Sequence, residues 1–457
     1  MVGIKKFKFT NILSRFGQIH PRTQKAHLNT ALGLTMKGGS MLISLLLVPL
    51  MIDYLDKDTY GVWLTISSMI TMLTFLDIGV GNGLRNKFSE AVANNDTKLA
   101  QTYVSTSYVS FSAIQLLLII LFLISFKYIP WNVLFNTTIN NSQLETIICI
   151  GVISMGLKLI FDLVLYVLFA LQQPGVVNAI TFVSNFFILI STYALTRLTQ
   201  GNLTYLAIIV TVVPIITTGV WSIVLYNGKL RDYIPSIKQY NSKYLKSLFS
   251  LGYQFFILQI AVIVIFYTDN FIINQLFGPS EVTTYNVCFR YFNAINTLFA
   301  IAIAPYWSAF TEAYIKTDVI WMTRTYNFLI KMWRGLIVVV LIMVAFSDYV
   351  YSSWIGTRVH VPLTLSVFSG LFVIVSSWNG INSSILNGLG KIRLQLLVAL
   401  FCSLINIPLA ILFGKTLHML SAGVIFATSV SLITASFVGG IQVRRLIRGG
   451  ANGIWNR

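Results

Sequence analysis

The chain has 457 residues, of which 56% are hydrophobic and only 10% are charged. A soluble domain carries about 25% charged residues, and long apolar runs recur from end to end, so the composition excludes a soluble protein and indicates an all-α polytopic membrane protein. The net charge of +18 would suit a nucleic-acid-binding protein, but the placement of the basic residues, described below, excludes that partner.

Twelve segments are long enough to cross a hydrocarbon core of about 30 Å as helices. A basic segment, residues 1–30, precedes them, and a basic tail, residues 444–457, follows them. Because no small-residue cleavage site is seen, we expect the first span to direct insertion. The predicted spans are residues 31–52, 60–82, 103–125, 145–171, 176–197, 204–226, 247–275, 282–308, 327–347, 362–386, 391–413 and 418–443.

The distribution of Lys and Arg sets the expected orientation, because cytoplasmic loops are enriched in both. Of the 32 basic residues, 24 fall on the side of the two termini, five on the opposite side and three within spans. We therefore predict that both termini are cytoplasmic. The charge of +18 is interpreted as a topology signal that also contacts anionic lipid.

A polar segment, residues 227–246, divides the spans into lobes at 31–226 and 247–443. The sequences "FSEAVANND" (88–96) and "FTEAYIKTD" (310–318) follow the second and eighth spans and match at five positions with a constant offset of 222 residues. Six spans per half predict parallel repeats. We expect two six-helix bundles around a central cavity, with the matched residues starting cytoplasmic helices in a structural role.

Two other features are interpreted as structural. "GVGNG" (79–83) lacks the spacing of a phosphate-binding loop and follows no strand, so its glycines are expected to end the second span and allow a turn. Cys149, Cys288 and Cys402 lie in apolar segments with no metal or disulfide spacing, and no metal site is expected.

A charge at the centre of a bilayer costs about 2.5–3.5 kcal/mol on insertion scales, so each in-span charge needs an explanation. Lys158 and Asp162 are four residues apart in the fourth span and share a helical face. Two further pairings are open from their depths, Lys37 with Asp77 and Asp269 with Arg290. The in-span ionisable residues are Lys37, Asp77, Lys158, Asp162, Asp269 and Arg290.

Polar residues also form stripes at helical spacing, which lipid does not solvate. Such stripes either join helices or line a cavity. They occur on the repeat-matched spans two and eight, and four and ten: Ser67, Thr71 and Thr74; Asn286, Arg290, Asn293 and Thr297; Lys158, Asp162 and Tyr166; and Ser376, Asn379, Ser383 and Asn387.

These residue types suit a phosphate-bearing sugar ligand. Lys158 and Arg290 are the candidate anion ligands, and Lys37 near the interface is a third or a gating residue. Asparagine and aromatic side chains suit sugar hydroxyls and ring faces. The candidates are Asn286, Asn293, Asn379 and Tyr166 for sugar, and Asp162, Asp269 and Asp77 for positioning the bases or binding a coupling H⁺ or Na⁺.

Four segments resemble the Wzx-type oligosaccharide flippases of the multidrug/oligosaccharidyl-lipid/polysaccharide (MOP) exporter superfamily, and the resemblance extends over the whole chain. They are "DIGVGNGLRNK" (77–87), "TDNFII" (268–273), "APYWSAFTEA" (304–313) and "LNGLGKIRLQ" (386–395). The two extra spans of the superfamily's lipid II flippases are not found.

The resemblance implies a bacterial cytoplasmic (inner) membrane protein that is a transporter, not an enzyme, and has no cofactor. Its substrate would be an undecaprenyl-pyrophosphate-linked oligosaccharide, moved between leaflets by alternating access in O-antigen, lipopolysaccharide or related polysaccharide biosynthesis. Membrane lipids and other polysaccharide-assembly proteins would be its partners.

Three alternatives remain open. A cation-coupled multidrug exporter of the same superfamily would favour an acidic cavity, whereas the in-span charges here balance. A multispan lipid-sugar glycosyltransferase would use an acidic loop motif such as Asp56 and Asp58 in "DYLDKD" (53–58), which also reads as a polar turn. A scaffolding protein would not need polar stripes on repeat-matched helices.

Overall fold

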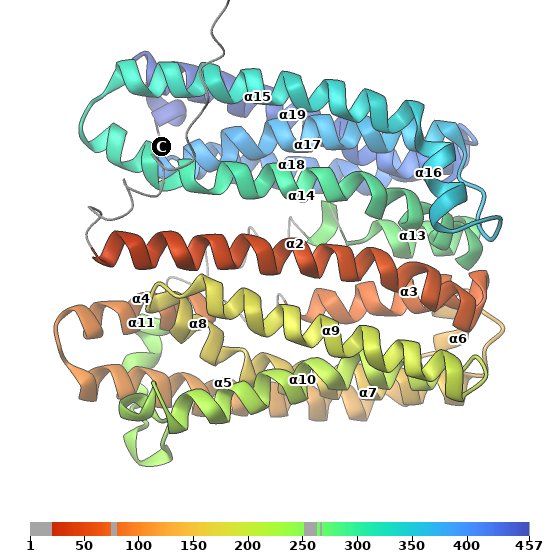
Figure 1. Cartoon of the computed structure of the whole chain (residues 1–457), viewed down its shortest axis with the longest axis horizontal. Helices are drawn as coiled ribbons and strands as arrows, with labels where there is room; N and C mark the ends of the chain where they lie inside the picture. Colours follow the sequence, from red (N-terminus) through yellow and green to blue (C-terminus); the bar gives the residue numbers. More distant parts are fainter. Residues whose placement is uncertain (1–20, 75–79, 251–262, 266, 457) are drawn as a thin grey trace, which may run out of the picture.

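A computed structural model describes residues 21–74, 80–250, 263–265 and 267–456 (Figure 1). Among these residues, ten helices are long and apolar enough to cross a membrane. The expected spans 60–82 and 247–275 each include residues outside the described ranges. The prediction of an all-α multi-pass membrane protein is confirmed.

The helices lie side by side along the long axis of the molecule (Figure 1). The first half contains α2 (Pro21–Leu55), α3 (Lys57–Met72), α4 (Val80–Ala93), α5 (Thr97–Ser125), α6 (Trp131–Leu134), α7 (Asn141–Phe161), α8 (Leu163–Ala170), α9 (Pro174–Leu198) and α10 (Leu203–Asn227). The second contains α11 (Leu245–Ser250), α13 (Asp269–Phe277), α14 (Pro279–Ile315), α15 (Val319–Ala345), α16 (Ser347–Trp354), α17 (Leu363–Leu389), α18 (Arg393–Ile411) and α19 (Leu420–Ile447).

The repeat predicted from the two short motifs is visible in their geometry. Asp96 and Asp318 are the N-caps of the helices that follow them. Each side chain accepts a hydrogen bond from the backbone N–H three residues later in the chain, at 2.9 Å in both cases. The hydroxyls of Ser89 and Thr311 donate to the carbonyls of Ala170 and Gly388, at the ends of α8 and α17. The motifs therefore have a structural role in equivalent places of the two halves. The expectation that they start helices is correct only for Asp96 and Asp318, because Ser89 and Thr311 lie near the ends of α4 and α14.

Residues 228–244, which connect the halves, pack on the start of α5. The backbone N–H of Ser236 donates to Ser105 Oγ at 3.0 Å, and that of Asn241 donates to Thr106 Oγ1 at 3.2 Å. Both acceptor side chains are fully buried. We call this end of the molecule the linker end; α4, α11 and the C-terminus also lie there (Figure 1). The opposite end, which carries α6, α13 and α16, is called the far end.

The interpretation of "GVGNG" was wrong for two of its glycines. Gly81 and Gly83 lie inside α4, which begins at Val80, and do not end a helix. A Cβ atom on Gly81 would lie 2.2 Å from the ring of Tyr166, and one on Gly83 would lie 2.0 Å from the Leu248 carbonyl oxygen. Close packing of α4 against α8 and α11, and not backbone turning, requires glycine at these two positions.

The acidic "DYLDKD" loop is also structural. Asp56 lies between α2 and α3 with a positive φ of 72° and accepts hydrogen bonds from the backbone N–H groups of Asp58 and Thr59. It is thus the N-cap of α3. This arrangement accounts for the motif without a glycosyltransferase site.

The two halves are joined at the far end. The Thr283 hydroxyl of α14 donates to the Lys57 carbonyl at 2.7 Å, and Asn136 Nδ2 donates to the Asn274 carbonyl at 2.9 Å. Asn274, which is fully buried, returns a hydrogen bond to the Phe135 carbonyl. A Cβ atom on Gly61 of α3 would lie only 1.8 Å from the Pro279 carbonyl oxygen, so α3 and the start of α14 are in backbone contact.

This contact predicts the effect of a larger side chain at Gly61. Gly61→Leu should separate α3 from α14 and lower the yield of a disulfide engineered between positions 57 and 283 several-fold in membranes, because no flexible side chain can move aside. Gly335→Leu in α15, where a Cβ atom meets no atom of the described structure within 4 Å, is the control. An unchanged yield in Gly61→Leu would contradict this description of the junction.

Candidate functional site

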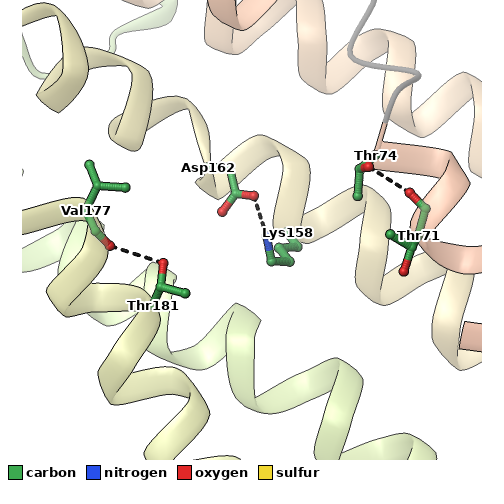
Figure 2. Close-up of polar contacts among 6 residues, drawn as sticks. All are labelled: Thr71, Thr74, Lys158, Asp162, Val177 and Thr181. Carbon is green, nitrogen blue, oxygen red and sulfur yellow. Dashed lines mark hydrogen bonds and ion pairs between the residues drawn. The ribbon is translucent and has the colours of Figure 1, made fainter. Parts of the chain in front are cut away.

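The predicted pairing of Lys158 with Asp162 is present in the first half (Figure 2). Lys158 Nζ donates to Asp162 Oδ2, and the two side chains are 30% and 15% exposed. Asp162 is the single residue between α7 and α8, where the regular hydrogen-bond pattern is interrupted. Its Oδ1 atom is buried and accepts no hydrogen bond from the residues that the structure describes. The aspartate therefore retains an unused acceptor beside the lysine.

Hydroxyl groups from two other helices lie around this ion pair. Figure 2 shows Thr71 of α3 and Thr74, which follows the end of that helix, on one side and Thr181 of α9 on the other. Thr71 and Thr181 donate to carbonyls of their own helices, of Ser67 and Val177. Their donors are thus satisfied, whereas their oxygens can still accept. In this view the ion pair lies between hydroxyl groups of α9 and of the end of α3.

The second half holds a buried carboxylate that differs from this pair. Asp269 is 4% exposed and accepts a hydrogen bond from the Tyr285 hydroxyl at 2.9 Å. Thr428 Oγ1 of α19 lies 3.4 Å from the same carboxylate oxygen, and Asn406 Nδ2 of α18 donates to Thr428 Oγ1 at 3.2 Å. Among the described contacts of Asp269 there is no basic side chain.

The possible pairing of Asp269 with Arg290 is therefore wrong. Arg290 Nη1 donates instead to the carbonyl of Ser44 in α2, at 3.1 Å, and lies 3.3 Å from the Ser44 hydroxyl. The two residues take different partners because the Tyr285 and Thr428 hydroxyls occupy the carboxylate, while α2 presents a carbonyl to the arginine. Arg290 thus connects α14 of the second half with α2 of the first.

The predicted asparagines of α14 also take part in contacts between helices. Asn286 Nδ2 donates to Asn270 Oδ1 at 2.7 Å, and Asn270 Nδ2 donates to the Ser68 hydroxyl of α3 at 2.6 Å. This chain of amides crosses from one half to the other. Asn293 accepts from Asn296 at 3.3 Å within α14.

Asn379 lines a cavity of about 190 Å³ in the second half, whose surface is mostly apolar. The lining combines amide and hydroxyl side chains of three helices with apolar ones; the polar members are Asn379, Asn382, Ser383, Gln395 and Gln442. Gln395 and Gln442 each have a buried side-chain oxygen without a hydrogen-bond partner in the described part of the chain. The cavity offers amides and no charge, which suits a neutral ligand with several hydroxyl groups.

The remaining candidates are less informative. The ring of Tyr166 packs on the backbone of α4 at Gly81. Lys37 is exposed on α2, and Asp77, its suggested partner, lies outside the described residues.

Sequence reasoning missed the side chains that complete these contacts. Asn270 is adjacent to Asp269 and lies at a depth where a polar residue needs a partner, so it could have been selected on the same argument. Thr428, Asn406 and Ser44 could not, because single hydroxyls and amides in a span usually join helices and carry no distinguishing spacing.

Comparisons with known proteins agree with this architecture. The family model described as polysaccharide biosynthesis protein matches residues 28–311. A putative O-antigen export protein of Yersinia pseudotuberculosis is 23% identical over 373 residues, covering 78% of this chain and 82% of that protein. A putative O-antigen transporter of Salmonella typhi is 20% identical over the same shares of the two chains.

Solved structures show the same fold at low identity. A multidrug-resistance MATE-family transporter of the MOP superfamily in an inward-facing conformation has a TM-score of 0.74 at 14% identity, covering 92% of this chain and 98% of that chain. An outward-facing conformation scores 0.63 at 15% identity, covering 95% and 98%. A MOP superfamily transporter from Pyrococcus furiosus scores 0.65 at 14% identity, covering 94% and 97%. The chain therefore belongs to the polysaccharide biosynthesis protein family and is a multi-pass membrane transporter with the MOP superfamily fold.

Proposed function

We propose that the protein is a flippase that moves an undecaprenyl-pyrophosphate-linked oligosaccharide from the inner to the outer leaflet of the bacterial cytoplasmic membrane. The observation that carries this proposal is the Lys158–Asp162 pair, a partly exposed cation held within a membrane-crossing segment. A transporter of apolar drugs does not need such a lysine, whereas a transporter of a pyrophosphate-bearing lipid needs a cation that binds the pyrophosphate. The similarity to O-antigen export proteins supports the same substrate class.

Lys158 is suited to bind an anion reversibly. In the present arrangement its charge is neutralised by Asp162, so the site is not left with an uncompensated cation between transport events. A pyrophosphate entering from the linker end would compete with Asp162 for the ammonium group. The unused Oδ1 of Asp162 and the hydroxyl oxygens of α3 and α9 would then lie near the first sugar.

The cavity at Asn379 is the proposed site for sugar in the second half, where its amide and hydroxyl side chains would bind sugar hydroxyls and its apolar wall would contact ring faces. It belongs to the other half of the chain from Lys158, and its lining residues carry no charge. We therefore assign the charged and the neutral parts of the ligand to different sites. The anionic group binds the first half and neutral sugar binds the second. Such a division places the substrate between the repeats, as in other transporters built from internal repeats.

Alternating access is supported by the closed far end. If the linker end is cytoplasmic, as the excess of Lys and Arg there indicates, these far-end contacts would close the outer side of the protein in the present state. Arg290 contributes to this closure through Ser44. Opening the far end would break that contact and make the guanidinium available to the substrate, so Arg290 would bind the anion only after the conformational change.

The proposed coupling site is Asp269. A buried carboxylate without a basic partner is costly unless it carries a proton or binds a cation. Oxygen atoms are the ligands that hard cations such as Na⁺ prefer. The Tyr285 and Thr428 hydroxyls supply them next to the carboxylate, and Asn406, which contacts Thr428, has an Oδ1 atom with no hydrogen-bond partner among the residues that the structure describes. Binding of H⁺ or Na⁺ here would adjust the packing of α13 on α19 and thereby the junction with α3.

The proposed role of Lys158 is tested by a pair of variants. Asp162→Asn leaves the lysine without its carboxylate, so it should bind a polyprenyl-pyrophosphate sugar at least as well as the parent protein. Asp162→Asn combined with Lys158→Gln has no net charge at the two positions, like the parent pair, but lacks the cation. A charge-assisted hydrogen bond is worth about 1.5–3 kcal/mol, so the double variant should bind roughly 10- to 100-fold more weakly. Binding is measured by fluorescence in nanodiscs, and equal binding by the two variants would contradict the role.

The role of Asp269 is tested by Asp269→Asn, which keeps the shape of the side chain and one acceptor oxygen but cannot bind an exchangeable proton or a cation through charge. Flipping in proteoliposomes should lose its stimulation by a pH or Na⁺ gradient, while equilibrium binding of the substrate is kept. Asp348→Asn, at an exposed acid of α16, is the control. Persistence of full gradient stimulation in Asp269→Asn would assign coupling to another residue.

A further inference from the structure

A largely apolar hollow lies between α3, α5 and α7 in the first half. Its volume is about 270 Å³, and its wall includes Ile70 of α3, Leu73 directly after that helix, Ile119 of α5, and Val152 and Leu159 of α7. Helix α7 follows it from Ile148 to Leu159, which is about 16 Å of helix. The hollow therefore extends along a large part of the membrane-crossing segment and is not a local packing defect.

The hollow has a polar end and an apolar end. Gln115 of α5 is 4% exposed, and its Nε2 atom donates no hydrogen bond to the residues that the structure describes. Its Oε1 atom lies 3.6 Å from the position that a Cβ of Gly156 would occupy. At the other end, toward α6, the wall is formed by Trp131 and Phe135. A buried amide donor without an acceptor indicates a ligand with acceptor oxygens at this end only.

The polar end is also the end next to Lys158. Leu159 lines the hollow and directly follows Lys158, and Leu73 lines it and directly precedes Thr74. Thr74 and Lys158 lie near each other in Figure 2. The hollow and the ion pair are thus neighbouring sites, one for hydrocarbon and the other for charge, at the linker end of α3.

We infer that this hollow binds the first isoprene units of a polyprenyl diphosphate while the diphosphate contacts Lys158 and Gln115. The inference rests on the proposed function and extends it, because the tail nearest the head then leaves the bilayer and enters the protein. The remaining tail extends between α3 and α5 into the lipid, which the exposed leucines of α5, such as Leu116 and Leu117, already face.

The position of the lysine favours a polyprenyl diphosphate over an ordinary phospholipid. Lys158 lies near the middle of the span Asn141–Ala170. A phospholipid keeps its head group at the membrane interface, whereas a transported lipid must bring its diphosphate to mid-membrane depth. Only the transported lipid therefore places an anion at Lys158 and hydrocarbon in the hollow at the same time.

A second apolar groove, between α9 and α10, provides a matched comparison. Its volume is about 390 Å³, and its lining includes Val183, Phe187 and Ile216 but no charged residue. Size and apolarity alone would favour this groove for a lipid tail. The lining of neither site contains a charged residue, but Lys158 directly precedes a lining residue of the hollow, whereas no lysine or arginine adjoins a lining residue of this groove in the sequence. We therefore expect that the groove does not retain a diphosphate-bearing lipid.

The experiment uses the full chain in proteoliposomes and a polyprenyl diphosphate with a photoreactive diazirine in the isoprene unit nearest the head. After illumination, mass spectrometry locates the labelled residues, and flipping of a complete lipid-linked oligosaccharide is measured in the same preparation. We expect label on α7 between Ile148 and Leu159 and on α5 near Ile119. Val152→Trp, which fills the hollow, should lower this labelling about tenfold or more, because the excluded methylene groups each contribute to binding. Val183→Trp should not lower it.

Each other outcome overturns the inference or the function separately. Label spread over the α9–α10 groove, or equal labelling of the hollow by a diazirine-bearing phosphatidylglycerol, would overturn the tail site while leaving flipping intact. Unchanged labelling in Val152→Trp would do the same, and the map on the parent protein does not depend on how that variant folds. Labelling of the hollow without flipping by the parent protein would contradict the proposed function and leave the tail site standing.

Discussion

The structure depends on how a few charged and strongly polar groups are accommodated in a chain that crosses a hydrocarbon layer many times. Each such group costs a few kcal/mol unless a partner compensates it. The two halves solve this differently: in the first, Lys158 and Asp162 neutralise each other on one helical segment. In the second, Asp269 is surrounded by hydroxyls and an amide. One site is thereby suited to exchange an anion and the other to take up a cation.

The internal repeat provides the frame on which these different sites are placed. The capping aspartates and the helix-joining hydroxyls occur in equivalent positions of both halves, so the backbone architecture is duplicated. The charged groups are not duplicated. The span that matches that of Lys158, residues 362–386, contains no lysine, and the span that matches that of Asp269, residues 31–52, contains no aspartate. In the proposed mechanism, a duplicated frame with unlike sites would allow the halves to move as similar bodies while binding different chemical groups.

Much of the fold could be predicted from the sequence because membrane insertion leaves few alternatives: length, apolarity and charge placement define the spans, and the matched motifs define the halves. The partners of the polar residues could be predicted only locally. Lys158 and Asp162 are four residues apart on one segment, so helical geometry alone brings them together. The partners of Asp269 and Arg290 depend on how α13, α14 and α19 pack on one another and on α2, which no spacing within one helix reveals. The glycines of α4 were misread for the same reason, since the atoms that exclude a side chain there come from Tyr166 and Leu248, far away in the chain.

The central claim is that the protein moves a complete lipid-linked oligosaccharide between leaflets. The most direct test is to extract the polyprenyl lipids of cells that lack the protein and determine, with an impermeant sugar-modifying enzyme, which leaflet holds the finished unit. The account predicts that finished units accumulate on the cytoplasmic leaflet and that the parent gene restores their export. Finished units on the outer leaflet at normal levels, or units that lack one sugar, would contradict it.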